Sequence, residues 1–298
     1  MLELDETLAE VIALSHDLGH TPFGHAGGDE LDRLLKAEGR KFGFDHNFQS
    51  FRVLTKLEKR YKGFDGLNLT FATLEGVLKH SYPYKSFLEG LRKDFHLDKH
   101  PSLEAIIVDY ADEVAYTSHD IDDGIKYELI SFDDLLQDEL SLRVDDMLQK
   151  EGIKRSENLY RHRFVAGLIK LLVEDFIENS QENVKKYRQN IPICSIVDAE
   201  EKLTLNFSQE TARQLKELKK LLYQKLYKHE KIISKMYAGK QCIKRLYVAF
   251  KEDNNLLPEH QRKLFDLRNK DRVIADYLAA MTDRYAMKTY HELYGYTL

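Results

Sequence analysis

Hydrophobic residues recur along this chain at spacings of three and four positions, which is the pattern of amphipathic helices. The first run contains Leu4, Leu8 and Val11 and leads directly to the pair His16 and Asp17. Further helical patterns cover residues 26–38, 46–61, 71–80, 102–126, 131–149, 157–178, 209–250 and 270–292. The pattern therefore predicts an all-α fold.

The composition favours the same fold. The 298 residues include 15 Gly and 5 Pro, or 20 in all, where average usage would give about 36. A chain with so few helix-breaking residues favours long helices over many strands and turns. Residues 183–208 differ from the rest, because Ile191, Ile193 and Leu203 alternate loosely with polar residues. We expect a short hairpin there.

The charge is close to balanced overall but unevenly distributed. There are 45 Lys+Arg and 50 Asp+Glu, a net charge of −5, which does not indicate a basic nucleic-acid platform. Residues 98–146 carry a net charge of −12, and residues 211–246 carry +9. The basic stretch also contains an apolar stripe that includes Leu218, Leu222 and Leu226. A solvated amphipathic helix is therefore favoured there over a nucleic-acid or phosphate site.

The cysteines and the first twenty residues indicate the cellular compartment in which the protein is expected. Cys194 and Cys242 form neither a CxxC pair nor a disulfide framework, which is typical of a reducing environment. The first twenty residues have no basic leader and no apolar stretch long enough to span a bilayer. We expect a cytoplasmic protein with no membrane partner.

The candidate chemistry begins at the end of the first helix. Residues 16–25, HDLGHTPFGH, place three imidazoles and a carboxylate within ten positions. Imidazole nitrogen and carboxylate oxygen both suit a divalent transition metal, and adjacent His16 and Asp17 at a helix end can turn toward one ion. A His-Asp pair alone is weak evidence, but its setting here favours a metal site.

A second group of polar residues lies within the helix predicted over 102–126. Asp112, Tyr116 and Asp120 recur at four-residue intervals, so they share one face of that helix. Along this face a carboxylate, a phenol and a second carboxylate follow one another at intervals of about one helical turn. The face is suited to hold a metal at one end and sugar hydroxyls further along.

These residues fall within segments that resemble a known family. The segments are HDLGHTPFGHAG, FDHNFQSFRVLTKLEKRY, GLNLT, LEGVLKH, SLEAIIVDYADEVAYTSHDIDDGI and IADYLAAMTDRYAM. Together they are similar to the bacterial deoxyguanosinetriphosphate triphosphohydrolase-like proteins of the HD superfamily, over residues 8 to about 290. The resemblance implies an HD-domain helical core over residues 1–130, with a helical C-terminal region, residues 131–298, packed on it.

The resemblance implies that His16, Asp17 and Asp112 are metal ligands. The cofactor would be a divalent metal ion, and Mn, Fe, Mg and Zn are not distinguished by these ligands. The family signature contains one more histidine, from an upstream helix, and no histidine precedes His16 here. We therefore expect the chain to be truncated at its N-terminus relative to its relatives, with a weaker metal site.

The resemblance also assigns catalytic and substrate-binding residues. It implies that His20 and His25 face the triphosphate and the scissile phosphorus, that His46 is a further catalytic histidine of the site, and that Tyr116 and Asp120 bind the sugar. Relatives carry a carboxylate three residues after the position of His25. Here that position is Gly28, followed by Asp29 and Glu30, so turnover is expected to be slow.

The implied activity is metal-dependent hydrolysis of deoxynucleoside triphosphates to deoxynucleoside and triphosphate. Another HD phosphohydrolase chemistry, such as that of a nucleotide phosphodiesterase or an alarmone hydrolase, is an alternative. A catalytically weakened nucleotide-binding subunit is a third possibility. The resemblance further implies a homo-oligomer with an activating nucleotide at a subunit interface, and nucleic acid is not a favoured partner.

Overall fold

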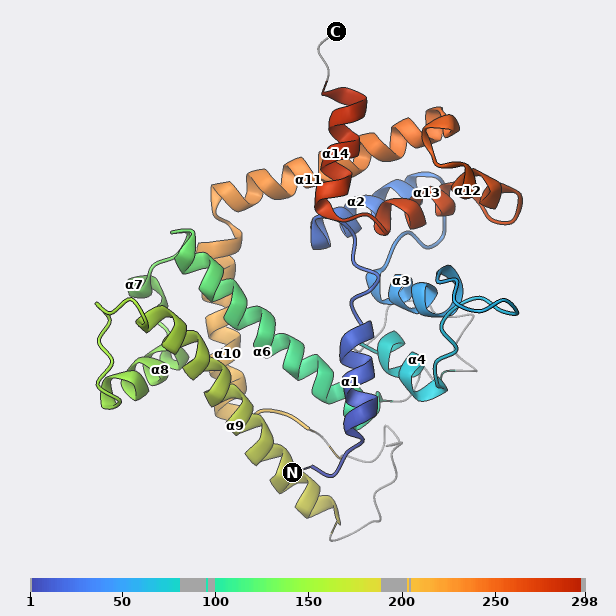
Figure 1. Cartoon of the computed structure of the whole chain (residues 1–298). Coiled ribbons are helices and arrows are strands. Elements are labelled where there is room, and N and C mark those ends of the chain that lie inside the picture. Colours follow the sequence, from blue (N-terminus) through green and yellow to red (C-terminus); the bar gives the residue numbers. More distant parts are fainter. Residues whose placement is uncertain (1, 81–94, 96–99, 189–202, 204, 296–298) are drawn as a thin grey trace. The chain divides into compact units, whose positions relative to one another are not determined.

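The structure, a computed structural model, is built from helices (Figure 1) and describes residues 2–80, 95, 100–188, 203 and 205–295. The helices are α1 (Glu6–Ser15), α2 (Gly24–Ala37), α3 (His46–Arg52), α4 (Phe71–Leu78), α6 (Leu103–Lys126), α7 (Phe132–Leu135), α8 (Glu139–Lys150), α9 (Tyr160–Arg188), α10 (Gln209–Leu222), α11 (Glu230–Glu252), α12 (Glu259–Arg262), α13 (Lys270–Ala279) and α14 (Asp283–Tyr294). Within the described residues only one isolated bridge, Lys59 with Gly66, has the geometry of β-structure. The predicted all-α class is confirmed.

The chain forms two compact units, and each unit combines segments that are distant in sequence. Unit 1 consists of residues 1–9 and 98–233, and unit 2 consists of residues 10–97 and 234–298. Both units thus contain segments from either side of residue 130. The division into a core over 1–130 and a C-terminal region over 131–298 stays a prediction.

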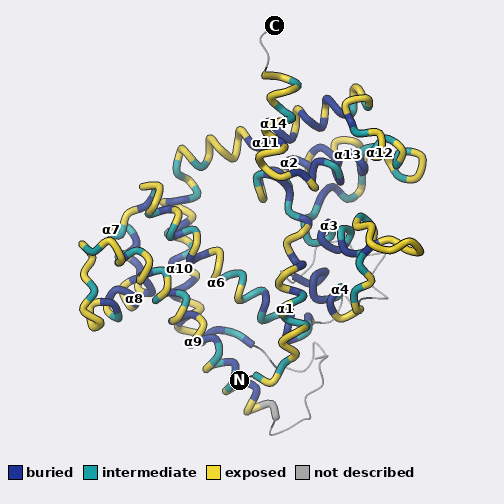
Figure 2. Tube along the Cα trace, in the orientation of Figure 1, coloured by how far each residue is buried: buried dark blue, intermediate teal, exposed yellow. Residues whose placement is uncertain are grey.

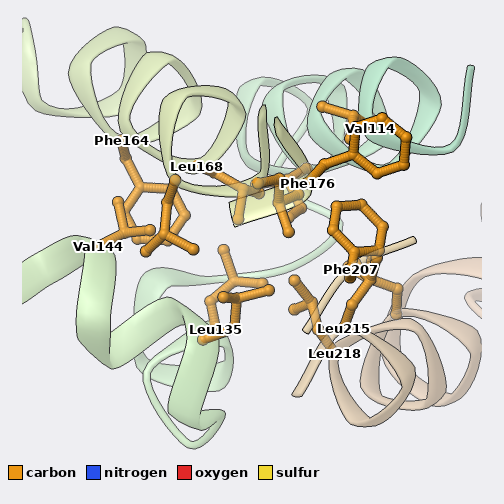
Figure 3. Close-up of a cluster of buried hydrophobic side chains, with 14 of the residues drawn as sticks. Val114, Leu135, Val144, Phe164, Leu168, Phe176, Phe207, Leu215 and Leu218 are labelled. Atoms are coloured by element: carbon orange, nitrogen blue, oxygen red, sulfur yellow. The ribbon is translucent and has the colours of Figure 1, made fainter. Parts of the chain in front are cut away.

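Unit 1 is a layered bundle in which α9 packs on α6 and α8, and α10 packs on α8. Buried and exposed positions alternate along α9 at helical spacing (Figure 2). Its core is apolar (Figure 3) and includes Val114, Leu135, Val144, Phe164, Leu168, Leu215 and Leu218. The hydrophobic stripe seen in the sequence at Leu218, Leu222 and Leu226 is buried in this core. The basic stretch is therefore amphipathic, as its pattern indicates, but the single helix predicted over 209–250 is divided into α10 and α11, with a π-helical segment, Tyr223–Tyr227, and a turn between them.

One buried carboxylate ties the connection between α8 and α9 to the unit 1 core. Asp145 accepts hydrogen bonds from the Arg155 guanidinium, with Nε at 3.0 Å, and from the Tyr160 hydroxyl at 2.5 Å. These hydrogen bonds, that of Arg155 first, lower the pKa of Asp145 to about 2 although burial acts to raise it. The carboxylate is therefore ionised at neutral pH.

Unit 2 has a main core and a smaller one. The main core packs α2 against the later part of α11 and against α13 and α14, and includes Leu31, Leu35, Ile243, Leu246, Ile274 and Leu278. The smaller core consists of Phe51, Leu78 and Phe95, with Phe48 and Leu74 packed against it, and it joins α3 to α4. Both cores lie next to the segments that carry the histidines.

Two predicted helices are divided in the structure because a polar side chain caps a new helix. The pattern over 131–149 is split into α7 and α8, since Ser131 and Asp134 form a capping box and the Asp138 carboxylate accepts from the Ser141 N–H at 3.0 Å. The pattern over 270–292 is likewise split, because Thr282 caps α14.

The prediction of a hairpin around 183–208 is wrong for its first residues. Residues 183–188 continue α9, which extends to Arg188 rather than ending near 178. Most of the remaining segment, including Cys194, lies outside the described residues. The described part of the chain contains no helix that is both long and apolar enough to cross a membrane.

Candidate functional site

The His16–Asp17 pair follows the last residue of α1, and hydrogen bonding fixes the His16 ring. The His16 backbone N–H still donates to the Ile12 carbonyl at 2.9 Å, so His16 continues the helical spiral. Its Nδ1 lies 2.8 Å from the Ala13 carbonyl oxygen. Because a carbonyl can only accept, Nδ1 carries the proton, and in the neutral form of the ring Nε2 is the nitrogen that presents a lone pair.

The loop after the pair is fastened to α3 through one hydroxyl. The Ser50 hydroxyl donates to the His16 carbonyl at 2.5 Å and accepts from the Gly19 N–H at 2.8 Å. A Cβ atom on Gly19 would lie only 2.2 Å from the His46 carbonyl oxygen and from the Ser50 nitrogen. Glycine is therefore required for the loop to approach α3 this closely.

The three histidines predicted as catalytic residues form one cluster in unit 2. The rings of His20 and His46 are stacked with centroids 4.3 Å apart. The His25 ring lies edge-on to both, 5.3 Å from His20 and 5.6 Å from His46. His20 and His25 flank the turn that begins α2, and His46 is the first residue of α3. The fold thus gathers side chains from three places in the sequence.

Asp17 joins this cluster to His16. Its carboxylate oxygens lie 3.4 Å from His16 Nε2 and 3.3 Å from His20 Nε2. Burial acts to raise the pKa of Asp17, but the neighbouring imidazoles of His16 and His20 outweigh it and hold that pKa well below its usual range. Asp17 is therefore an ionised carboxylate beside the Nε2 of His16.

The surroundings of His46 favour its uncharged form, whereas those of Asp17 favour the charged form. Burial, followed by the proximity of His20 and His25, lowers the pKa of His46 to about 4. The imidazole is consequently neutral at pH 7, where it can both donate and accept a hydrogen bond.

A further histidine, which is not among the predicted site residues, lies in the same unit. His80 follows α4, and its ring centroid is 4.5 Å from that of His16. Both residues are buried, with 6% and 8% of their surface exposed. The Asn47 side-chain amide donates to the His80 carbonyl at 2.8 Å. The sequence shows only a lone histidine at a helix end, which is an ambiguous signal.

Asp112, Tyr116 and Asp120 lie on α6 in unit 1, on one face as their spacing predicts. Tyr116 is 38% exposed, and the Lys219 ammonium lies 5.5 Å from its ring centroid. Asp120 accepts a hydrogen bond from the Tyr227 hydroxyl. Burial raises the pKa of Asp120, although that hydrogen bond acts in the opposite direction.

The two acidic residues after Gly28, Asp29 and Glu30, bind basic side chains. Glu30 is buried and binds Arg33 through both carboxylate oxygens, at 2.5 and 3.0 Å. Asp29 is exposed and forms an ion pair with Lys240 at 3.2 Å. Neither carboxylate is therefore placed to stand in for one at Gly28.

The donor set in unit 2 suits a divalent metal ion. In its neutral form His16 presents a lone pair at Nε2, and the ionised Asp17 carboxylate lies 3.4 Å from that atom. Two ligands of one ion are separated by about this distance when each is about 2.0–2.3 Å from the metal. The residues present therefore fit a metal that accepts mixed nitrogen and oxygen ligands.

The helical fold, the His-Asp pair and comparison with known families define the class of protein. Residues 1–117 match the family model described as HD domain, and residues 205–292 match the model described as phosphohydrolase-associated domain. HD domains bind divalent metal ions, so this is a metal-dependent phosphohydrolase of the HD class.

More specifically, the chain belongs to the deoxyguanosinetriphosphate triphosphohydrolase-like proteins. It is 58% identical to the protein of that name from Wolinella succinogenes over 98% of this chain and 80% of the relative. It is 37% identical to the one from Geobacter metallireducens, over 98% of this chain and 74% of that relative. A relative from Leptospira interrogans is 38% identical over 98% and 75% of the two chains. The resemblance noted in the sequence is confirmed.

Proposed function

We propose that this protein hydrolyses deoxynucleoside triphosphates to deoxynucleoside and inorganic triphosphate. The observation that carries the proposal is the cluster of His20, His25 and His46 beside the His16–Asp17 pair, in a chain of this family. Several neutral or protonated imidazoles beside a metal site suit a substrate with a long anionic phosphate chain.

The proposed metal ligands are His16, Asp17 and Asp112. A bound divalent ion, whether Mn, Fe, Mg or Zn, would polarise a phosphoryl oxygen and lower the pKa of water at neutral pH. Within the chain, the Ala13 carbonyl fixes the tautomer of His16, and Ser50 fixes the adjoining backbone. These contacts hold the donors in position before an ion arrives.

The three proposed catalytic histidines have different roles in proton transfer and charge neutralisation. His25 donates a proton to the leaving 5′-oxygen, and His20 neutralises charge that develops on the phosphates. His46 stacks on His20 and, with its lowered pKa, stays neutral. It therefore acts as a rigid hydrogen-bonding neighbour that does not add a second positive charge.

The proposed sugar site is the face of α6 that carries Tyr116 and Asp120. The half-exposed Tyr116 ring offers an apolar surface to the deoxyribose, and Asp120 accepts a hydrogen bond from its 3′-hydroxyl. The Tyr227 hydroxyl already donates to Asp120 and orients the carboxylate. These contacts would favour a nucleotide over a simple phosphate ester.

The test is product analysis with each dNTP in turn, using the purified chain supplied with Mn²⁺. Intact triphosphate and deoxynucleoside, separated by ion-exchange chromatography, are the expected products. Their formation should fall at least about 100-fold in His25→Ala, since loss of a general acid costs about 10²–10⁴-fold. Release of pyrophosphate or single phosphate, or equal cleavage of a generic phosphodiester, would favour the phosphodiesterase alternative.

A second candidate function is a nucleotide-binding subunit with weak turnover. It is favoured by one observation: Asp29 and Glu30 are paired with Lys240 and Arg33, which leaves the position of Gly28 without a substitute carboxylate. Gly28→Glu separates the two functions. Faster triphosphate release in that variant, with unchanged dNTP affinity, supports the weakened subunit.

We also propose that the protein acts as a homo-oligomer that binds an activating nucleotide at a subunit interface. Light scattering at several protein concentrations, with and without dGTP, tests this part. A single monomeric species under all conditions contradicts it.

A further inference from the structure

We propose that His80 is a ligand of the same divalent ion as His16, supplied by the end of α4. This inference rests on the metal dependence in the proposed function and adds a protein ligand to the set His16, Asp17 and Asp112. The juxtaposition that carries it is the His16–His80 pair within unit 2.

The two rings are close enough to share one ion. Their centroids are 4.5 Å apart, and one ring nitrogen of each lies within 4.8 Å of the other. Two nitrogen ligands about 2.1 Å from one metal lie up to about 4.2 Å apart. A movement of a few tenths of an ångström therefore brings both nitrogens into the first coordination sphere.

Separate backbone contacts fix the ring of His16 and the main chain of His80. The ring of His16 is fixed by the Ala13 carbonyl, and Asn47 on α3 holds the backbone of His80 through its carbonyl oxygen. The neighbours of His80 in α4, Val77 and Leu78, are fully buried in apolar packing. A polar imidazole at this place, beside the ring of His16, is explained by a shared cation.

A substitution of His80 that keeps the ring volume distinguishes a metal ligand from a residue that only packs. His80→Phe retains an aromatic ring but removes both nitrogens, and His80→Ala removes the ring. His16→Ala serves as the variant that must lose the metal. His260→Ala, at an exposed position in unit 2, is the matched control.

The first readout is Co²⁺ affinity, followed by the visible absorption of the bound ion, with the whole chain and no nucleotide. We expect His80→Phe and His80→Ala to bind Co²⁺ at least about 10-fold more weakly than wild type. The second readout is the number of imidazole nitrogens coupled to bound Mn²⁺ by electron spin echo. That number should fall by one in both His80 variants and stay constant in His260→Ala.

The outcomes distinguish this inference from the proposed function. Unchanged Co²⁺ affinity and an unchanged imidazole count in His80→Phe, with helical circular dichroism and melting temperature retained, overturn the role of His80 alone. Absence of Co²⁺ and Mn²⁺ binding in the folded wild-type chain overturns the proposed metal dependence together with it. Should His80→Ala fail to fold, the His80→Phe result decides.

Discussion

Gly19 and Ser50 are in direct contact: the Gly19 N–H donates to the Ser50 hydroxyl at 2.8 Å, and the space for a side chain on Gly19 is filled by α3. The same hydroxyl donates to the His16 carbonyl. The position of the His16–Asp17 pair therefore depends on how closely this loop approaches α3.

Gly19→Ala should move the loop away from α3 and destabilise unit 2. A methyl group 2.2 Å from two backbone atoms cannot be accommodated without a backbone shift, and overpacking of this kind costs about 1–3 kcal/mol. Urea unfolding measures the change, and metal affinity should fall with it. Gly63→Ala is the control, because a Cβ there meets open space. Equal stabilities for the two variants would contradict the packing described.

The Asp145 carboxylate should make stability depend on pH in the acid range. Its pKa is about 2 in the folded protein, against about 3.9 in an unfolded chain. A lowered pKa of this kind contributes stability that is fully present above pH 4 and is lost as the pH falls through about 2. The contribution is on the order of 2 kcal/mol.

Asp145→Asn tests this contribution. Guanidinium unfolding between pH 2 and 7 should show a smaller loss of stability on acidification in the variant than in wild type. Exposed Asp29→Asn serves as the reference. Parallel stability curves for wild type and Asp145→Asn would contradict the expected role of Arg155 and Tyr160.

The buried ionic network of unit 2 should be sensitive to loss of its one acidic member. Asp276 accepts hydrogen bonds from Arg52 and from Gln49, the latter at 3.2 Å, and forms an ion pair with Arg272 at 3.3 Å. Removing it leaves two largely buried guanidinium groups without their carboxylate, which costs about 3–5 kcal/mol.

Thermal and urea unfolding of Asp276→Ala should show this loss. The control is Glu259→Ala, which breaks an ion pair with Lys263 that is exposed on both sides and is worth about 0–1 kcal/mol. If the two variants lose similar stability, the Asp276 network does not stabilise unit 2 as described.

His46 should remain neutral through the physiological range. Its pKa of about 4 lies below the ordinary value near 6.5, so the unfolded chain binds the proton more readily than the folded one. Stability should consequently rise as the pH increases from about 4 to 6.5. In a histidine-labelled sample, the ring proton signal of His46 should not shift between pH 5.5 and 8. A titration midpoint near 6.5 for His46 would exclude the lowered value.

The sequence predicted the helical class because the spacing of apolar residues is a local property that each helix displays by itself. Helix ends were harder, since a short polar segment can either continue a helix or cap a new one. Asp138 and Thr282 begin new helices inside patterns that read as continuous. The extension of α9 to Arg188 was missed because residues 179–188 are mostly polar, so the apolar periodicity ends near residue 178.

The grouping of His20, His25 and His46 could be anticipated from the family resemblance, and the structure brings their rings together. The position of His80 could not be anticipated, because its neighbour His16 is 64 residues away and no local pattern links them. The same holds for the contact of Gln49 with Asp276. Such contacts depend on how helices pack, which periodicity does not specify.

The composition of unit 2 has a consequence for the synthesis of the protein. Leu31 and Leu35, close to the histidine cluster in sequence, share their core with Ile243 and Ile274. A nascent chain therefore carries the complete His16–Asp17 segment long before the residues that cover the apolar face of α2 have left the ribosome. Until then that face is exposed to chaperones and proteases, and a chain ending before residue 234 would lack the partner helices needed to shield it.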